Sequence, residues 1–158
     1  MAPLPAALSG EVARELLASR IPARLAYLGA DGTPRVLPIW FHWTGEAVII
    51  ATSASSPKFR AIRRHPDLAL TIDSEAPPYR SLQIRGRAEI EIVDGLAPEY
   101  ETMAHRYYPK AAAELWLARA RAHVLRQARL TLRPAWARVL DVAALSPELV
   151  KVLKRRHG

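Results

Sequence analysis

Hydroxyl and cationic side chains are concentrated between residues 52 and 64. An apolar run ends there in Thr52 and Ser53, and the pair Ser56-Pro57 has the pattern of a helix cap followed by the first helical residue. Four cations follow, namely Lys58, Arg60, Arg63 and Arg64. Because the start of a helix offers free N–H groups and a positive dipole end, this segment predicts a phosphate site. A capped helix with a solvated basic face is the alternative that these residues leave open.

A second segment, residues 35–41, places a proline inside an apolar run. Pro38 has no N–H to donate to a β-ladder, so we expect this strand at a sheet edge or at a bulge. Its unpaired backbone groups would then be free to hydrogen-bond the polar rim of a planar heterocycle. The same residues also fit a core strand that packs through Trp40 and Phe41.

Short strands joined by turns are predicted around both segments. The dipeptides Asp31-Gly32 and Thr44-Gly45 lie in two predicted turns, of which the first has a strong hairpin signal. Seven antiparallel strands are expected, over residues 23–28, 34–42, 47–52, 68–73, 81–93, 125–132 and 136–142. The first three are expected to form a meander, with the run 47–52 buried on both faces. Gly86, inside a long strand, predicts a bulge or a close backbone approach.

Helices are expected over residues 9–20, 57–65, 98–123 and 146–156. Ser9 is the predicted N-cap of the first, Pro109 is predicted to break the third into two, and the fourth is basic. Short antiparallel strands with a few helices indicate a mainly β protein, a β-barrel with helical decoration. We expect one domain over residues 1–158, because no repeat or linker divides the chain.

Composition excludes several kinds of chemistry. The chain has no cysteine, which excludes disulfides, thiolate metal sites and a cysteine nucleophile, and its five histidines are scattered, so we expect no metal site. Glycine-rich phosphate loops and the nucleophile-elbow motif are absent, and no catalytic residue is assigned. Because no apolar run reaches roughly 18 residues and no signal peptide is recognisable, we expect a cytoplasmic protein with no membrane partner.

The formal net charge of +8 favours an anionic partner. Nucleic acid is one such class, prompted by the arginines within residues 119–133. Arginines mixed with alanines along a helix are, however, typical of a solvated face, so we do not expect a nucleic-acid partner.

Several short motifs occur in an order that resembles one known family. They are Gly32-x-Pro34-Arg35-Val36-x-Pro38-Ile39-Trp40-Phe41, Thr52-x-x-x-Ser56-x-Lys58, Arg64-x-Pro66-x-x-Ala69-Leu70, Pro78-Tyr79-Arg80 and Ile84-x-Gly86-x-Ala88-Glu89. Together they resemble the pyridoxamine 5′-phosphate oxidase-like split-barrel family, within the flavin and deazaflavin oxidoreductases. The resemblance covers residues 20–93, and a weaker likeness continues to residue 141.

The resemblance implies a split β-barrel that works as a homodimer, with the cofactor in the cleft between subunits. The residues matching the ring-binding strand are Arg35, Val36, Leu37, Pro38, Ile39 and Trp40. Those matching the ribityl-phosphate site are Thr52, Ser53, Ser56 and Lys58, and Arg35 and Arg80 are further predicted contacts to phosphate or ring. The implied cofactor is FMN, with the deazaflavin coenzyme F420 as the alternative.

The resemblance also implies an activity, namely an oxidoreductase that passes hydride between this cofactor and a small organic substrate. The basic residues that would bind pyridoxal phosphate are not recognisable in residues 133–141, so vitamin B6 oxidation is not expected. Instead, residues 40–43 (Trp-Phe-His-Trp) look like those of actinobacterial relatives that bind FMN or F420. A non-catalytic carrier or sensor of flavin or haem on the same barrel is the alternative.

Overall fold

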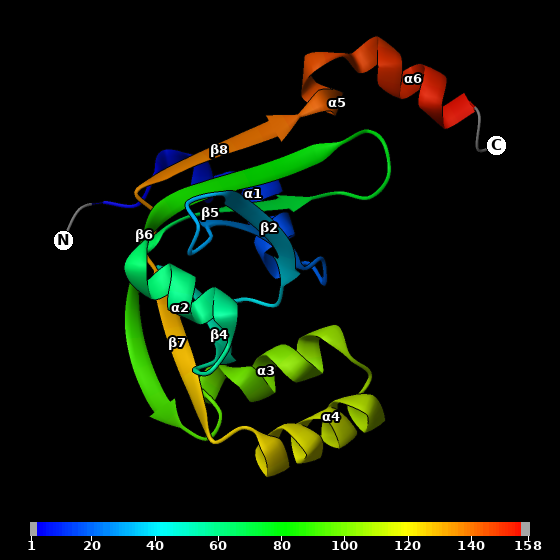
Figure 1. Ribbon diagram of the computed structural model, residues 1–158. Helices are drawn as coiled ribbons and strands as arrows, with labels where there is room; N and C mark the ends of the chain where they lie inside the picture. Colours follow the sequence, from blue (N-terminus) through cyan, green and yellow to red (C-terminus); the bar gives the residue numbers. More distant parts are fainter. Residues whose placement is uncertain (1–2, 156–158) are drawn as a thin grey trace.

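In the computed structural model, which describes residues 3–155, the centre of the molecule is an antiparallel sheet (Figure 1). Its eight strands are β1 (Ala23–Leu28), β2 (Pro34–Ile39), β3 (His42–Trp43), β4 (Val48–Ser53), β5 (Asp67–Asp73), β6 (Arg80–Asp94), β7 (Arg126–Leu132) and β8 (Trp136–Asp141). They pair in the order β2-β1-β5-β6-β7-β4-β3, and β8 pairs with β6. Since the end strands β2 and β3 do not pair with each other, the barrel is split, as the sequence predicts.

The helices lie on the outside of the sheet. They are η1 (Ala6–Ser9), α1 (Glu11–Ala18), α2 (Pro57–Arg64), α3 (Pro98–Tyr107), α4 (Lys110–His123), α5 (Val142–Leu145) and α6 (Pro147–Arg155). In Figure 1, α3 and α4 lie side by side at one end of the barrel, and α5 and α6 project from the other end. In the described part of the chain, no helix has the length and apolar character needed to cross a membrane.

The long strand β6 joins the two halves of the sheet. Residues 80–87 pair with β5 and β8, and residues 88–94 pair with β7. The change of partner falls at Gly86, where a Cβ atom would lie 2.4 Å from the carbonyl oxygen of Arg133. The close backbone approach predicted at this glycine is confirmed, and it allows β6 to serve both halves of the barrel.

The core fills the barrel and continues under the helices. Residues 48–52 of β4 are all buried, which confirms the prediction of a strand covered on both faces. Leu16 and Leu17 of α1 and Phe59 and Ile62 of α2 close the core from outside the sheet. The ends of β2 and β4 and the start of α2 are therefore anchored to one packed interior.

One strand end, one strand pairing and one helix cap differ from the predictions. The strand predicted over residues 34–42 ends at Ile39, because Phe41 turns into the core and is fully buried before β3 begins. The predicted meander does not form, since β4 pairs with β3 and β7 and not with β2. Gly10, not Ser9, is the N-cap of α1, and Ser9 instead donates its hydroxyl to the carbonyl of Ala6.

The predicted C-terminal helix is in fact two helices. The carboxylate of Asp141 accepts a hydrogen bond from the amide of Ala143 at 3.0 Å and so starts the short helix α5. Pro147 then begins α6, because proline suits a first helical position but cannot continue a helix. Residue 156, the predicted end, lies outside the described residues. The break at Pro109 between α3 and α4 is confirmed.

Candidate cofactor site

A cleft of about 450 Å³ opens where the ends of β2 and β4 and the start of α2 face the helices α3 and α4. Its volume lies within the range of roughly 300–1,000 Å³ that is usual for small-molecule and cofactor sites. The lining residues are Pro38, Ile39, Trp40, Ala51, Thr52, Ser53, Ser56, Lys58, Tyr100, Tyr108, Trp116, Val124 and Gln127. Seven of the predicted cofactor-binding residues are thus brought together in one place.

Hydroxyl groups mark the polar end of the cleft. Ser56 is the N-cap of α2, as predicted, and its Oγ accepts a hydrogen bond from the amide of Phe59 at 3.2 Å. The Oγ1 of Thr52 lies 3.4 Å from the same Ser56 oxygen. Pro57 has no N–H, and the amide of Lys58, in the first turn of α2, has no carbonyl acceptor within the helix. These groups form a neutral, donor-rich surface at the positive end of the helix dipole.

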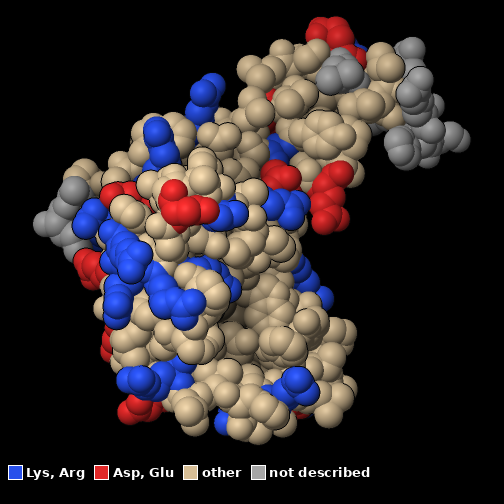
Figure 2. Space-filling model, viewed as in Figure 1, with Lys and Arg blue, Asp and Glu red and all other residues tan. Residues whose placement is uncertain are grey.

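Lys58 supplies a cation at this end of the cleft. Its side chain is half-buried, and this burial lowers the pKa of its ammonium group. Among the ion pairs of the described residues, none involves Lys58 or the three arginines of α2. Figure 2 shows Lys and Arg side chains gathered on the face where α2 lies. An anion at the start of α2 would therefore meet positive charge that no carboxylate of the described residues has neutralised.

Aromatic side chains form the opposite wall of the cleft. Trp40 stacks on Tyr107 with ring centroids 5.2 Å apart and meets Tyr108 and Trp116 edge-on at 5.0 and 5.9 Å. The indole N–H of Trp116 donates to the hydroxyl of Tyr100 at 3.0 Å. This wall presents flat apolar surface next to the polar end, which is the combination that a planar, phosphate-bearing molecule requires.

The backbone beside Trp40 belongs to an edge strand. β2 pairs only with β1 among the described strands, so one side of its backbone is left without a ladder partner. This confirms the edge position that Pro38 predicts. Pro38 and Ile39 themselves line the cleft.

Arg106 of α3 fixes the link between β2 and β3. Its guanidinium donates to the carbonyls of Leu17 at 2.5 Å and Ser19 at 2.8 Å, at the end of α1, and to that of Phe41 at 3.5 Å. It also lies over the ring of Phe41, 4.7 Å from the centroid, and burial lowers its pKa. The Phe41 amide donates to the hydroxyl of Tyr107, so both the amide and the carbonyl of Phe41, the residue after Trp40, are hydrogen-bonded to α3.

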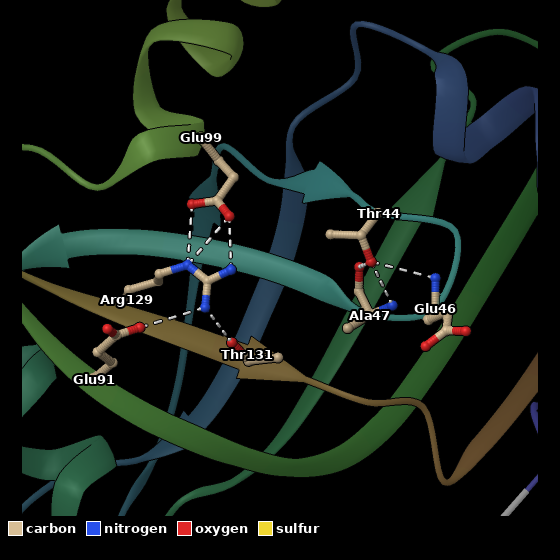
Figure 3. Close-up of polar contacts among 7 residues, drawn as sticks. All are labelled: Thr44, Glu46, Ala47, Glu91, Glu99, Arg129 and Thr131. Atoms are coloured by element: carbon tan, nitrogen blue, oxygen red, sulfur yellow. Dashed lines mark hydrogen bonds and ion pairs between the residues drawn. The ribbon is translucent and has the colours of Figure 1, made fainter. Parts of the chain in front are cut away.

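The first turn of α3 is fixed to the sheet by an ion pair that Figure 3 shows in detail. Glu99 accepts hydrogen bonds from Nε and Nη2 of Arg129, on β7, at 3.0 and 2.6 Å. Arg129 also donates to Thr131 at 3.0 Å and lies 3.6 Å from Glu91. The hydrogen bonds from Arg129 hold the pKa of Glu99 below its ordinary value near 4.5. This pair sets the start of the helix that carries Tyr100 and Tyr107.

We expect Glu99→Gln to lower the free energy of unfolding by about 1 kcal/mol near neutral pH, because the pair is bidentate and partly shielded from water. Since the pKa of Glu99 is lower in the folded state, its contribution is complete above the ordinary glutamate pKa. It is lost as the pH falls through the folded-state pKa. Urea denaturation should thus show a wild-type advantage that shrinks once the pH falls below the ordinary glutamate pKa and disappears as the pH falls through the lower folded-state pKa.

Glu101→Gln is the matched control for that experiment, because the ion pair between Glu101 and Arg121 is exposed on the same two-helix unit. Exposed pairs contribute little, so this variant should match the wild type at every pH. An equal loss in both variants would show that the Glu99 pair has no special role in anchoring α3.

Four predicted site residues lie outside this cleft. Arg35 pairs with Asp31 at 2.7 Å beside the first turn, and Arg80 pairs with Glu15 of α1 at 2.5 Å. Val36 is exposed, and Leu37 packs against the core. Because the predicted cofactor cleft lies between two subunits, a single chain does not test these contacts, and they stay predictions.

Half of the lining residues that were not predicted from the sequence come from the helical insert, residues 98–123. The lining residues that were not predicted are Ala51, Tyr100, Tyr108, Trp116, Val124 and Gln127. The signal that was available is the density of aromatic residues in α3 and α4. No local pattern shows, however, that these helices fold back over Trp40. In the described part of the chain, no group of three or more His, Asp or Glu side chains is arranged to hold a metal ion.

A family model described as pyridoxamine 5′-phosphate oxidase matches residues 9–141. The chain belongs to this family. The match contains every residue that lines the cleft, whereas α5 and α6 lie beyond it. The residues matched by the family model therefore include all eight strands of the split barrel, the edge strand β2 among them, and the capped helix α2.

Solved structures give the same fold. An F420 reductase is 27% identical over 79% of this chain and 94% of its own, with a TM-score of 0.58. A conserved hypothetical protein from Mycobacterium tuberculosis is 19% identical over 91% of this chain and 92% of its own, with a TM-score of 0.64. The haem storage protein HutZ from Vibrio cholerae is 16% identical over 81% and 90%, with a TM-score of 0.56. No curated protein matches the chain.

Proposed function

We propose that this member of the pyridoxamine 5′-phosphate oxidase family binds FMN, or alternatively F420, in the cleft between α2 and the aromatic wall. The bound cofactor would exchange hydride with a small organic substrate. The observation that carries the proposal is Lys58, a half-buried cation at the start of α2 that has no anionic partner among the described residues. Burying a lysine without a partner is unfavourable, so its presence in a cleft favours an anionic ligand.

The residues at the two ends of the cleft have different roles in this proposal. Lys58, Ser56, Thr52 and Ser53 would hold the phosphate through charge and hydroxyl hydrogen bonds. The backbone at the end of the edge strand β2 would hydrogen-bond the polar rim of the ring, and Trp40, which follows the strand, would support the ring with its aromatic neighbours. These residues bind, orient and shield the cofactor from water; the hydride chemistry is supplied by the cofactor itself.

Two observations bear on the choice between FMN and F420. FMN has one phosphate, which Ser56 and Lys58 would satisfy. F420 adds a polyglutamate tail, and the exposed Arg60, Arg63 and Arg64 of α2 have no carboxylate partner among the described residues. The likeness to an F420 reductase at 27% identity also supports F420 as the alternative.

A non-catalytic carrier or sensor is the second candidate on this fold, prompted by the likeness to a haem storage protein. The cleft itself gives little support for haem. None of the described residues that line it is a histidine, methionine or cysteine, which are the usual axial ligands besides tyrosine. Tyr100 and Tyr108 are the only described lining residues that could ligate iron, and a Tyr100 ligand would lose the hydrogen bond to Trp116.

We also propose a homodimer. Apolar side chains are exposed on the paired strands β1 and β2, with Val36 70% and Leu28 41% exposed, beside a groove that Leu28, Pro34 and Trp136 line. Contiguous exposed apolar surface of this kind marks protein–protein contact sites. Light scattering should give twice the chain mass at micromolar concentration, and a monomer at every concentration would contradict this part of the proposal.

Turnover separates an oxidoreductase from a carrier. The cofactor-loaded protein is mixed with a chemical or nicotinamide reductant, and then with a nitroaromatic or an enone acceptor. Reduction of the cofactor followed by its reoxidation at a rate above that of free cofactor is the expected result. Bound cofactor that is reduced and reoxidised no faster than free cofactor would favour the carrier.

A further inference from the structure

A second hollow, of about 620 Å³, lies between the end of α1, the strand β3 and the helix α3. It is lined by Arg14, Leu17, Ala18, Arg20, His42, Trp43, Thr102 and Arg106. None of these residues lines the cofactor cleft. The hollow is therefore a separate feature of the surface, although Arg106 connects it to the link between β2 and β3.

Positive charge in this hollow has no acidic counterpart. Three arginines and one histidine line it, and no aspartate or glutamate does. None of the three arginines belongs to an ion pair of the described residues, whereas Arg24, Arg80, Arg87, Arg121, Arg129 and Arg133 all do. The nearby carboxylate of Glu99 interacts with His42 but is already held by Arg129.

The three arginines differ in how firmly they are held. Arg106 is half-buried and neutralises the carbonyl end of α1, so that the negative end of this helix dipole is covered. Arg14 donates to the carbonyl of Ser9 at 2.5 Å. Arg20 is exposed and makes no polar contact with another described residue. Arg14 and Arg20 are therefore available to contact a ligand, with Arg106 as the fixed cation behind them.

Apolar surface completes the hollow. The indole of Trp43 is half-buried and the methyl group of Ala18 is exposed, while Leu17, at 2% exposure, packs beneath them. An indole next to arginines suits a flat molecule that carries an anionic group, because the ring covers the apolar part while the guanidinium groups bind the oxygens. Thr102 adds a hydroxyl that can donate or accept.

We propose that this hollow binds a small organic anion in which a phosphate or carboxylate group is attached to a planar apolar body. Two kinds of anionic group fit the same arginines, since guanidinium binds carboxylate and phosphate in the same bidentate geometry. The site is independent of the proposed cofactor function, because it shares no residue with the cofactor cleft.

The test is calorimetric titration of the full chain with phenyl phosphate and, separately, with benzoate. The variants are Arg20→Gln and the double variant Arg14→Gln/Arg20→Gln, with circular dichroism to verify folding. Lys58→Ala reports on the cofactor cleft, and Arg121→Gln, in an exposed ion pair elsewhere, is the matched control. The tighter-binding probe identifies the preferred anionic group.

Saturable binding is expected, with the affinity at the hollow reduced about tenfold or more in the double variant and unchanged in Arg121→Gln. Any additional binding of a probe at the cofactor cleft is recognised as the part that is lost in Lys58→Ala. Quenching of Trp43 fluorescence that is lost in Trp43→Phe is expected alongside. The proposal is overturned if neither probe binds the wild type. It is also overturned if binding is lost in Lys58→Ala but kept in the double variant, because the anion then binds at α2.

Discussion

Replacing Lys58 by alanine is expected to weaken cofactor binding by about 1.5–3 kcal/mol, which is roughly a 10- to 150-fold increase in Kd. The expectation rests on the half-buried ammonium group at the start of α2, for which the described residues provide no counter-charge. A phosphate there would be bound by a charge-assisted hydrogen bond in a partly shielded cleft. Titration of wild type and variant with FMN and with F420 measures the change.

Lys151→Ala is the matched control, because Lys151 is an exposed lysine on α6, in the part of the chain that projects from the barrel. It should leave both affinities unchanged. Burial lowers the pKa of Lys58, and none of the ion pairs of the described residues involves it, so the variant loses no ion pair and should retain the wild-type Tm to within a few degrees. Equal cofactor affinity in Lys58→Ala and wild type would show that the phosphate does not bind at the start of α2.

Gly86→Ala should destabilise the protein by about 3 kcal/mol, at the upper end of the usual cost of overpacking. The added Cβ would lie 2.4 Å from the carbonyl oxygen of Arg133 and 3.1 Å from a methyl group of Leu132. A backbone atom cannot yield as the far end of a flexible side chain does, so β6 and the β7–β8 link, which contains Arg133, must shift apart. For a chain of this length the Tm should fall by about 6–12 °C, measured by calorimetry.

Gly10→Ala is the matched control, since its Cβ would find only one atom within 4 Å, the carbonyl oxygen of Ala7 at 3.6 Å. The φ angle of Gly10 is −69°, which any residue adopts. The change should cost about 1 kcal/mol or less, because alanine is a poorer N-cap than glycine but restricts the unfolded chain. If Gly86→Ala were as stable as Gly10→Ala, the fold of β6 would not depend on the close approach of the Arg133 carbonyl to this glycine.

Signals confined to a few neighbouring residues predicted structure reliably in this chain. Gly32 and Gly45 have φ angles of +77° and +97°, the left-handed values that their predicted turns require. Ser56-Pro57 forms the predicted cap and first residue of α2. The apolar run that became β4 is buried as expected. The turns and the cap depend on interactions between residues close in sequence, and the apolar run of β4 shows its burial by composition alone.

Interactions between distant segments were not predictable in the same way. The pairing of β4 with β7 and not with β2 joins distant segments, and Gly86 in β6 indicates only that another part of the backbone approaches closely. The aromatic wall joins Trp40 to residues of α3 and α4 about 60 or more positions away, through ring contacts that have no sequence spacing of their own. Seven residues that line the cleft could therefore be predicted from the sequence, and the other six are recognised only in the structure.

Equilibrium titration of the purified protein with FMN and with F420, followed by cofactor absorbance, tests the central proposal most directly. We predict saturable binding of at least one of them, with one cofactor per chain and a much weaker affinity in Lys58→Ala. FMN binding would identify a flavoprotein, and F420 binding without FMN binding would identify a deazaflavin protein. Binding of neither cofactor would contradict the proposal and leave the cleft between α2 and the aromatic wall without an assigned ligand.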